Sequence, residues 1–144
     1  MLIRLKNKDT LIIGDFALKC VIGENGIKSK KVEGDRSTPK GKFTLGKLYF
    51  RKDRENKPKT KIKTKFIIPK MGWCDDPKSK YYNKECTLGK NIKCEKLYRK
   101  DNIYDFLIPL NYNTKKIIPY KGSAIFIHLT KNYKKTKGCI ALKK

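Results

Sequence analysis

The chain has 144 residues, of which 38% are hydrophobic; the length suits one domain over residues 1–144, and the composition is too apolar for a disordered tail. No stretch approaches the ~18 uncharged apolar residues that a membrane span requires, which excludes a transmembrane segment. The 37 Lys and Arg against 13 Asp and Glu give a formal net charge of +24, which is typical of proteins that meet a polyanion or a membrane surface.

The N-terminal part of the chain predicts a β-meander followed by a long loop. Three short strands are expected, with a Gly-Asp turn between the last two, at Leu2–Leu5, Thr10–Ile13 and Phe16–Ile22. The segment Gly23–Pro39 is rich in Gly, Asp and Pro and predicts a loop. Loops of this kind often carry functional residues.

The rest of the chain also predicts a mainly β fold. It contains an apolar segment at Phe43–Phe50, a solvated excursion at Arg51–Lys65, strand character at Phe66–Ile68 and Ile103–Leu110, and a loop at Asp76–Lys96. The nearly continuous apolar run Ser123–Ile127 predicts a central buried strand that ends at His128.

Cysteine usage argues against a metal site. The five cysteines are Cys20, Cys74, Cys86, Cys94 and Cys139. Because the count is odd, at least one thiol should be free. Cys86 and Cys94 could form a disulfide in an oxidising compartment, but their spacing fits no zinc site.

The most informative feature is the only histidine, His128, which precedes Cys139 by eleven residues. An imidazole aimed at a thiol can take its proton, and an imidazolium beside the thiol would lower its pKa below the ordinary ~8.5. The amides of Gly138 and Cys139 could then stabilise an oxyanion, with the Thr136 hydroxyl as a further donor. From spacing alone, a lone His and a nearby Cys are more often a packed core histidine and a buried thiol.

Several motifs in the chain resemble the L,D-transpeptidase catalytic domain (YkuD type), in its short-loop branch with T-x-G-C. They are Gly23–Gly26, Glu33–Phe43, Gly72–Pro77, Tyr82-Asn83, Asn102–Asp105, Gly122–His128 and Thr136–Cys139. The resemblance covers nearly the whole chain. It implies a mainly β fold, a β-sandwich or open barrel with a minor helix. It also implies that Cys139 is the nucleophile, that His128 is its general base, and that the main-chain carbonyl of Leu129 orients the imidazole.

The chain departs from the commoner family pattern at two positions. Lys137 stands where His usually precedes Gly-Cys, and Ala141 stands where Arg usually follows. The side-chain roles of that His and Arg therefore do not carry over.

Other residues have a chemistry that suits a peptide substrate, since carboxylates can bind a free amine and aromatic rings can pack on a chain. The candidates for substrate contact are Thr136, Trp73, Asp75, Tyr104 and Asp105, with Asp35 as a further carboxylate. Each also fits a turn or a core anchor.

The resemblance implies acyl transfer on peptidoglycan stem peptides, with a part in cell-wall biogenesis and cell shape. The Cys139 thiolate would attack the carbonyl of an L-residue bonded to a D-residue and release the D-amino acid. An amine acceptor makes the enzyme a transpeptidase, whereas water makes it an L,D-carboxypeptidase, and the sequence leaves both open. We expect a monomer that needs no cofactor and no metal.

The place of action and one other class of function stay open. The resemblance implies the cell envelope or periplasm, yet Met1–Thr10 shows no secretory signal, so the cytoplasm is not excluded. The other class is a non-catalytic polyanion or nucleic-acid-binding module that uses the positive charge. Specific nucleic-acid binding is not expected, because Arg is scarce and A/T-rich codons would also produce many Lys.

Overall fold

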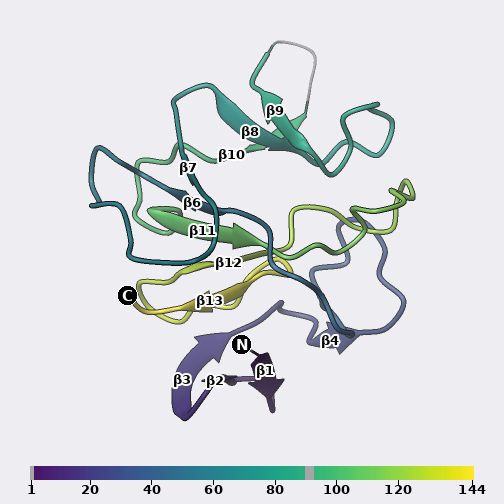
Figure 1. Cartoon of the computed structure of the whole chain (residues 1–144). Helices are drawn as coiled ribbons and strands as arrows, with labels where there is room; N and C mark the ends of the chain where they lie inside the picture. Colours follow the sequence, from purple (N-terminus) through teal and green to yellow (C-terminus); the bar gives the residue numbers. More distant parts are fainter. Residues whose placement is uncertain (1, 90–92) are drawn as a thin grey trace.

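The computed structural model describes residues 2–89 and 93–144, and within them the regular structure consists of thirteen short strands (Figure 1). Their bounds are β1 Ile3–Lys6, β2 Thr10–Ile13, β3 Phe16–Val21, β4 Ile27–Lys28, β5 Thr38–Pro39, β6 Leu48–Phe50, β7 Thr64–Phe66, β8 Met71–Cys74, β9 Glu85–Thr87, β10 Cys94–Lys96, β11 Phe106–Pro109, β12 Phe126–Leu129 and β13 Ile140–Leu142. The mainly β prediction is confirmed.

The expected minor helix is absent from the residues that the structure describes. Gly, Pro and Asn interrupt the segments between strands, and none of these segments keeps a helical period long enough to nucleate a helix. Over the same residues, the chain has no helix with the length and apolarity needed to cross a membrane.

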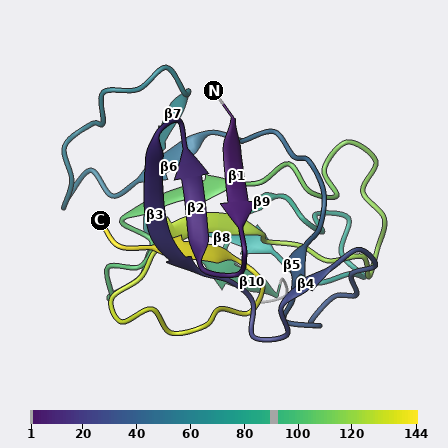
Figure 2. The ribbon, with the colours of Figure 1, turned by 90° about the horizontal axis from the view of Figure 1, so that it is seen from below.

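The strands form three sheets. The largest has eight strands in the order β1-β2-β3-β13-β12-β11-β6-β7, the second has the order β10-β8-β9, and the third pairs β4 with β5. In the large sheet β12 and β13 run parallel, as do β6 and β7. The three-stranded sheet lies on one side of the central strands β11, β12 and β13, and the N-terminal meander lies on the other (Figures 1 and 2).

Each face of the central strands packs against its own hydrophobic cluster. The cluster toward the three-stranded sheet contains Tyr49, Ile67, Met71, Trp73, Leu97, Tyr104, Leu107, Phe126 and Cys139. The cluster on the other face contains Leu11, Cys20, Ile22, Leu110, Ile125 and Ile140. Because side chains alternate along a strand, Phe126 and His128 share the first face while Ile125 and Ile127 face the second.

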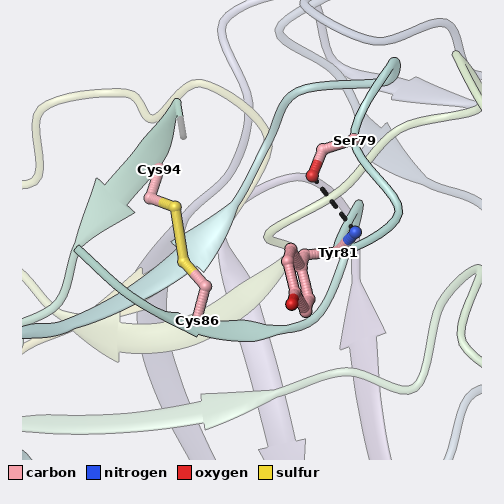
Figure 3. Close-up of a disulfide and its surroundings, with 4 residues drawn as sticks. All are labelled: Ser79, Tyr81, Cys86 and Cys94. Atoms are coloured by element: carbon pink, nitrogen blue, oxygen red, sulfur yellow. Dashed lines mark hydrogen bonds between the residues drawn. A yellow bond between two sulfur atoms is a disulfide. The ribbon is translucent and has the colours of Figure 1, made fainter. Parts of the chain in front are cut away.

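A disulfide joins the two outer strands of the three-stranded sheet. Cys86 on β9 is bonded to Cys94 on β10, with β8 between them (Figure 3). The bridge lies against Gly72 of β8, where an added Cβ would approach Leu88 Cδ2 at 2.6 Å, Cys94 Cβ at 3.0 Å and Cys86 Sγ at 3.2 Å. The chain therefore has a glycine where a side chain would collide with Leu88 and crowd the disulfide. Cys20, Cys74 and Cys139 are free and buried.

Several predicted segments differ from the structure. Ser123–Ile127 was expected as a strand, but β12 begins later, at Phe126, because Ala124 has φ 53° and left-handed backbone cannot continue a strand. The loop predicted at Asp76–Lys96 contains β9 and β10, so that prediction is wrong in part. The predicted meander is confirmed, and β2 has the predicted bounds.

The predicted solvated excursion Arg51–Lys65 is wrong at its first residue. Arg51 is 3% exposed. Its guanidinium pairs with Asp53 at 2.7 Å and donates to Arg99 O at 2.7 Å. It also stacks over the Tyr98 ring. The composition of this segment predicts exposure to solvent, but a guanidinium with such close partners can be buried.

Candidate active site

The parallel pairing of β12 and β13 brings two side chains to one face of the sheet. His128 lies within β12, and Cys139 directly precedes β13. β12 pairs with β13 so that Ile127 lies opposite Ile140 and His128 opposite Ala141. Continued by one residue, this register places Cys139 beside Phe126, on the same face as His128. The parallel pairing thus makes neighbours of two side chains that are eleven residues apart in the sequence.

The sulfur of Cys139 is held between two main-chain groups of the segment before β12. Phe126 N donates to Sγ at 3.3 Å, and Sγ donates to Ala124 O at 3.3 Å. Ala124 is itself held in its left-handed conformation by Asn83, whose Oδ1 accepts from Ala124 N at 3.1 Å. Among the described residues, the hydrogen bonds of Sγ go to these groups and not to His128.

The ring of His128 is oriented by the main chain and by one aromatic neighbour. Its Nδ1 lies 2.8 Å from Leu129 O, which can only accept, so Nδ1 carries the proton of the neutral ring and Nε2 keeps a free lone pair. Tyr104 packs edge-on against the imidazole with ring centroids 5.1 Å apart. The ring is thereby held in the tautomer that a general base needs.

The turn before Cys139 is closed by Thr136. Its hydroxyl donates to Cys139 O at 2.6 Å and accepts from Gly138 N at 3.1 Å. Two of the three predicted donors, the Gly138 amide and the Thr136 hydroxyl, are therefore engaged with each other or with Cys139 O in this conformation. Thr136 thereby fixes the turn that precedes Cys139.

Thr38 ties this turn to the long loop near the N-terminus. The Thr38 hydroxyl donates to Gly138 O at 2.8 Å and accepts from Gly23 N at 3.0 Å. Gly138 has φ 134°, and a Cβ there would lie 2.9 Å from Ser37 O. At Gly23 an added Cβ would lie 2.5 Å from Arg36 O. Only glycine allows the two loops to approach this closely.

A buried ion pair holds the loop that contains Ser37 and Thr38. Lys31 Nζ donates to Asp35 Oδ1 at 2.5 Å and to Ser37 O at 2.7 Å. The Lys31 and Asp35 side chains are 4% and 10% exposed. Burial alone would raise the pKa of Asp35, but hydrogen bonds from Lys31, Ser37 and Val32 outweigh it and lower the pKa to about 2. Asp35 therefore supports the loop and is not available to a substrate amine.

Burial governs the acidity of both members of the predicted pair. Burial raises the pKa of the Cys139 thiol to about 12, against smaller lowering effects from the Phe126 amide and Lys31. Burial likewise lowers the pKa of His128, outweighing its hydrogen bond to Leu129 O. The sequence-based prediction of a lowered thiol pKa is thus wrong for the free protein, because desolvation penalises the thiolate more than its neighbours favour it. Thiol and imidazole are both neutral at pH 7.

A comparison with protein families agrees with this arrangement. The family model described as the L,D-transpeptidase catalytic domain (YkuD) matches residues 2–144. The chain belongs to the L,D-transpeptidase catalytic domain family. The comparisons with curated proteins and with solved structures found no match. The family acts on peptidoglycan peptides and is typically cell-wall related, so this L,D-transpeptidase domain is of that enzyme type.

Two predicted substrate residues of the L,D-transpeptidase domain are built into its core. Trp73 is 9% exposed, packs edge-on against Phe126, and donates from Nε1 to Asn83 Oδ1 at 3.0 Å. Asp105 is 1% exposed and accepts from Arg54 and Asn102, each at 3.0 Å. The polar atoms of both side chains are engaged by partners within the protein, and their contact with a substrate stays a prediction.

Tyr104 and Asp75 have different environments. Tyr104 is 6% exposed and touches His128 and Phe126, and its hydroxyl donates to Glu95 at 3.1 Å. It therefore orients the imidazole from within the core. Asp75 is half-buried, and its Oδ1 has no partner among the described residues. Burial raises the pKa of this carboxyl.

The two departures from the family pattern lie in different surroundings. Ala141 is fully buried opposite His128, and its methyl group occupies the face on which Cys139 lies. Lys137 is exposed. No side-chain hydrogen bond or ion pair engages Lys137 among the described residues.

Sequence reasoning missed the residues that hold the main chain around Cys139. These are Thr38, Lys31 and Asn83. The only signal for Thr38 and Asn83 was membership in the Glu33–Phe43 and Tyr82-Asn83 motifs, which does not reveal partners up to 100 residues away. Lys31 lies outside both motifs and carried no signal. Across residues 2–89 and 93–144, no group of three or more His, Cys, Asp and Glu is arranged to hold a metal ion.

Proposed function

We propose that this L,D-transpeptidase domain transfers acyl groups of peptidoglycan stem peptides through a thioester on Cys139. The observation that carries the proposal is the orientation of His128, because its Nδ1 is bound by Leu129 O and its Nε2 lone pair is left for a proton. Cys139 lies on the same face of the adjacent parallel strand. This is the arrangement of a nucleophile, its base and the group that orients the base.

The reaction begins from the neutral pair. The thiol turns from Ala124 O toward His128 Nε2, and its proton passes to the imidazole as Sγ attacks the carbonyl carbon of the L-residue. The S–C bond forms, the C–N bond to the D-residue breaks, and the imidazolium returns the proton to the leaving amine. Burial suits this order of events, because a neutral imidazole at pH 7 can accept a proton.

The thioester is then resolved by a second nucleophile. An amine attacks the thioester carbon and loses its proton to His128, and the C–S bond breaks as the imidazolium returns a proton to the departing Sγ, which makes the enzyme a transpeptidase. Water in place of the amine gives the L,D-carboxypeptidase reaction by the same steps. The transpeptidase reaction is our proposal because it is the activity named by the family.

The experiment is incubation of the whole chain with tetrapeptide muropeptides, followed by mass analysis of the products. We expect loss of the terminal D-residue together with cross-linked dimers. A carbapenem should add its mass once, and peptide mapping should place it on Cys139. Cys139→Ala should abolish both turnover and adduct formation, and Cys139→Ser should lose nearly all of both. Cys20→Ala is a control, since Cys20 is a fully buried free thiol in the other hydrophobic cluster. Turnover that survives in Cys139→Ala would refute the proposal.

A further inference from the structure

A pocket lined by lysines lies beside the loop that supports the nucleophile. It has a volume of about 420 Å³ and is bounded by the segment after β4 and the loop after β11, with Lys30, Lys31, Lys116 and Lys121 in its wall. Figure 1 shows these two loops passing beside each other, and Glu33 N donates to Tyr120 O across them at 2.8 Å. None of the residues that line the pocket is Asp or Glu.

Three of the four lysines keep their charge uncompensated. Lys31 is neutralised by Asp35 within its own loop. Over the part of the chain that the structure describes, Lys30, Lys116 and Lys121 form no ion pair, and all three are exposed. Three ammonium groups around one pocket repel one another, and an anion in the pocket would relieve this repulsion.

The wall of the pocket is rigid. Asn113 donates from Nδ2 to Ile118 O and to Gly122 O, each at 3.0 Å, and its Oδ1 accepts from Ile118 N at 2.9 Å. Tyr112 donates to Lys121 O at 2.5 Å. Asn83 anchors the start of the loop by donating to Tyr112 O at 3.0 Å. The main chain that carries Lys121 is thus fixed before any ligand arrives, which reduces the entropic cost of binding.

We propose that this pocket binds a phosphate group. Three free ammonium groups match an anion of charge about −2 with several acceptor oxygens better than a single carboxylate, and lysine binds phosphate as a point charge. Ser29 and Asn113, which also line the pocket, add polar groups at its wall. The volume of about 420 Å³ exceeds what one phosphate needs, so the phosphate belongs to a larger ligand, either a small diphosphate or one segment of a phosphate polymer.

The site would also give part of the high positive charge a specific role. Its ligand binds at the lysines and not at Cys139, so the phosphate proposal does not depend on the proposed acyl transfer. The Cys139→Ala variant should bind phosphate as the parent chain does, even where it has lost all turnover. Loss of activity and loss of phosphate binding are therefore separate results.

The test is isothermal titration of the whole chain with inorganic phosphate, diphosphate and long-chain polyphosphate at two salt concentrations. The variant Lys30→Gln/Lys116→Gln/Lys121→Gln is compared with Lys57→Gln/Lys59→Gln/Lys61→Gln, whose lysines are exposed elsewhere. Each variant lowers the net charge from +24 by three. We expect the pocket variant to bind roughly tenfold more weakly or worse, since hydrogen bonds to charged groups are lost, and the control variant to stay within about twofold. Thermal unfolding confirms that both variants fold.

Two results would support the phosphate site. If diphosphate binds most tightly, the ligand of the pocket is small, and if polyphosphate binds most tightly, the ligand is a polymer. Equal weakening in both variants would show diffuse attraction and overturn it, as would the absence of saturable binding for all three probes. An oligoglutamate that binds as tightly as diphosphate would overturn the preference for phosphate over carboxylate.

Discussion

Replacing Thr38 with valine removes one hydroxyl that serves two buried main-chain groups. The residue is 2% exposed, and its hydroxyl joins Gly138 O at 2.8 Å and Gly23 N at 3.0 Å. Valine keeps the shape but leaves both groups without this partner. Each buried group that loses its hydrogen bond costs ~1–3 kcal/mol, so we expect the free energy of unfolding to fall by about 2–6 kcal/mol.

The stability loss should appear in urea and thermal unfolding. For a domain of this size, 1 kcal/mol corresponds to roughly 2–4 °C, so the Tm of Thr38→Val should fall by roughly 4–24 °C. Thr38→Ser keeps the hydroxyl and should retain most of the stability. Thr87→Val is the matched control, because Thr87 is exposed at the end of β9. A Thr38→Val protein within about 0.5 kcal/mol of the parent would refute this account of the loop.

The same variant should lose activity beyond its loss of stability. Thr38 fixes Gly138, which precedes the proposed nucleophile Cys139, so a looser turn would misplace Cys139 Sγ relative to the attacked carbonyl. Misplacement by about 1 Å can cost on the order of a hundredfold in rate. Turnover measured at a temperature where the variant is fully folded, with kcat lowered more than KM is raised, would show this effect. An unchanged kcat would show that the position of Cys139 does not depend on the hydrogen bond from Thr38 to Gly138 O.

Three further predictions concern acidity, the buried ion pair and the disulfide. Iodoacetamide should label Cys139 slowly at pH 7 and faster as the pH rises toward 12, because burial raises its pKa to about 12 and only the thiolate reacts; peptide mapping that finds Cys139 labelled first at pH 7 would contradict this. Asp35→Asn should lower the free energy of unfolding by ~3–5 kcal/mol in urea, because it leaves the buried Lys31 charge without its carboxylate partner. In the parent chain the stability from Asp35 should be complete above pH 3.8 and lost as the pH falls through about 2, since the folded pKa is the lower one. Reduction of Cys86–Cys94 should cost about 2–3 kcal/mol, and an unchanged urea midpoint in dithiothreitol would refute it.

The sequence predicted the mainly β fold and the meander because these depend on local signals. In strand β2 three consecutive apolar residues lie before the Gly14-Asp15 turn, and the run that contains Phe126 is apolar apart from Ser123. The short strands β8, β9 and β10 carry no such signal. Met71–Cys74 pairs on both sides and is fully buried, yet it includes a glycine that makes room for a disulfide. Pairing with distant partners defined these strands, and local propensity did not.

The candidate site divides in the same way. His128 and Cys139 could be found because His128 follows an apolar run, Cys139 begins one after Gly138, and the family motifs name both. Their acidity could not be predicted, because it depends on how much protein covers the sulfur. Trp73 and Asp105 have the chemistry of substrate residues, but Asn83 and Arg54 occupy their polar atoms. Only the folded chain shows which polar groups are already used.

The burial of Cys139 sets a condition on catalysis. A preformed thiolate would be strongly disfavoured, since burial is the largest effect on the pKa of the thiol and Glu95 adds to it. Lys31 opposes this effect, while Asp35, 2.5 Å from Lys31, partly cancels its charge. In the proposed reaction the negative charge on sulfur would therefore develop only as the S–C bond to the substrate carbonyl forms, with His128 taking the proton in the same step. A neutral base held by Leu129 O meets this requirement, whereas a stable thiolate–imidazolium pair in the free enzyme does not.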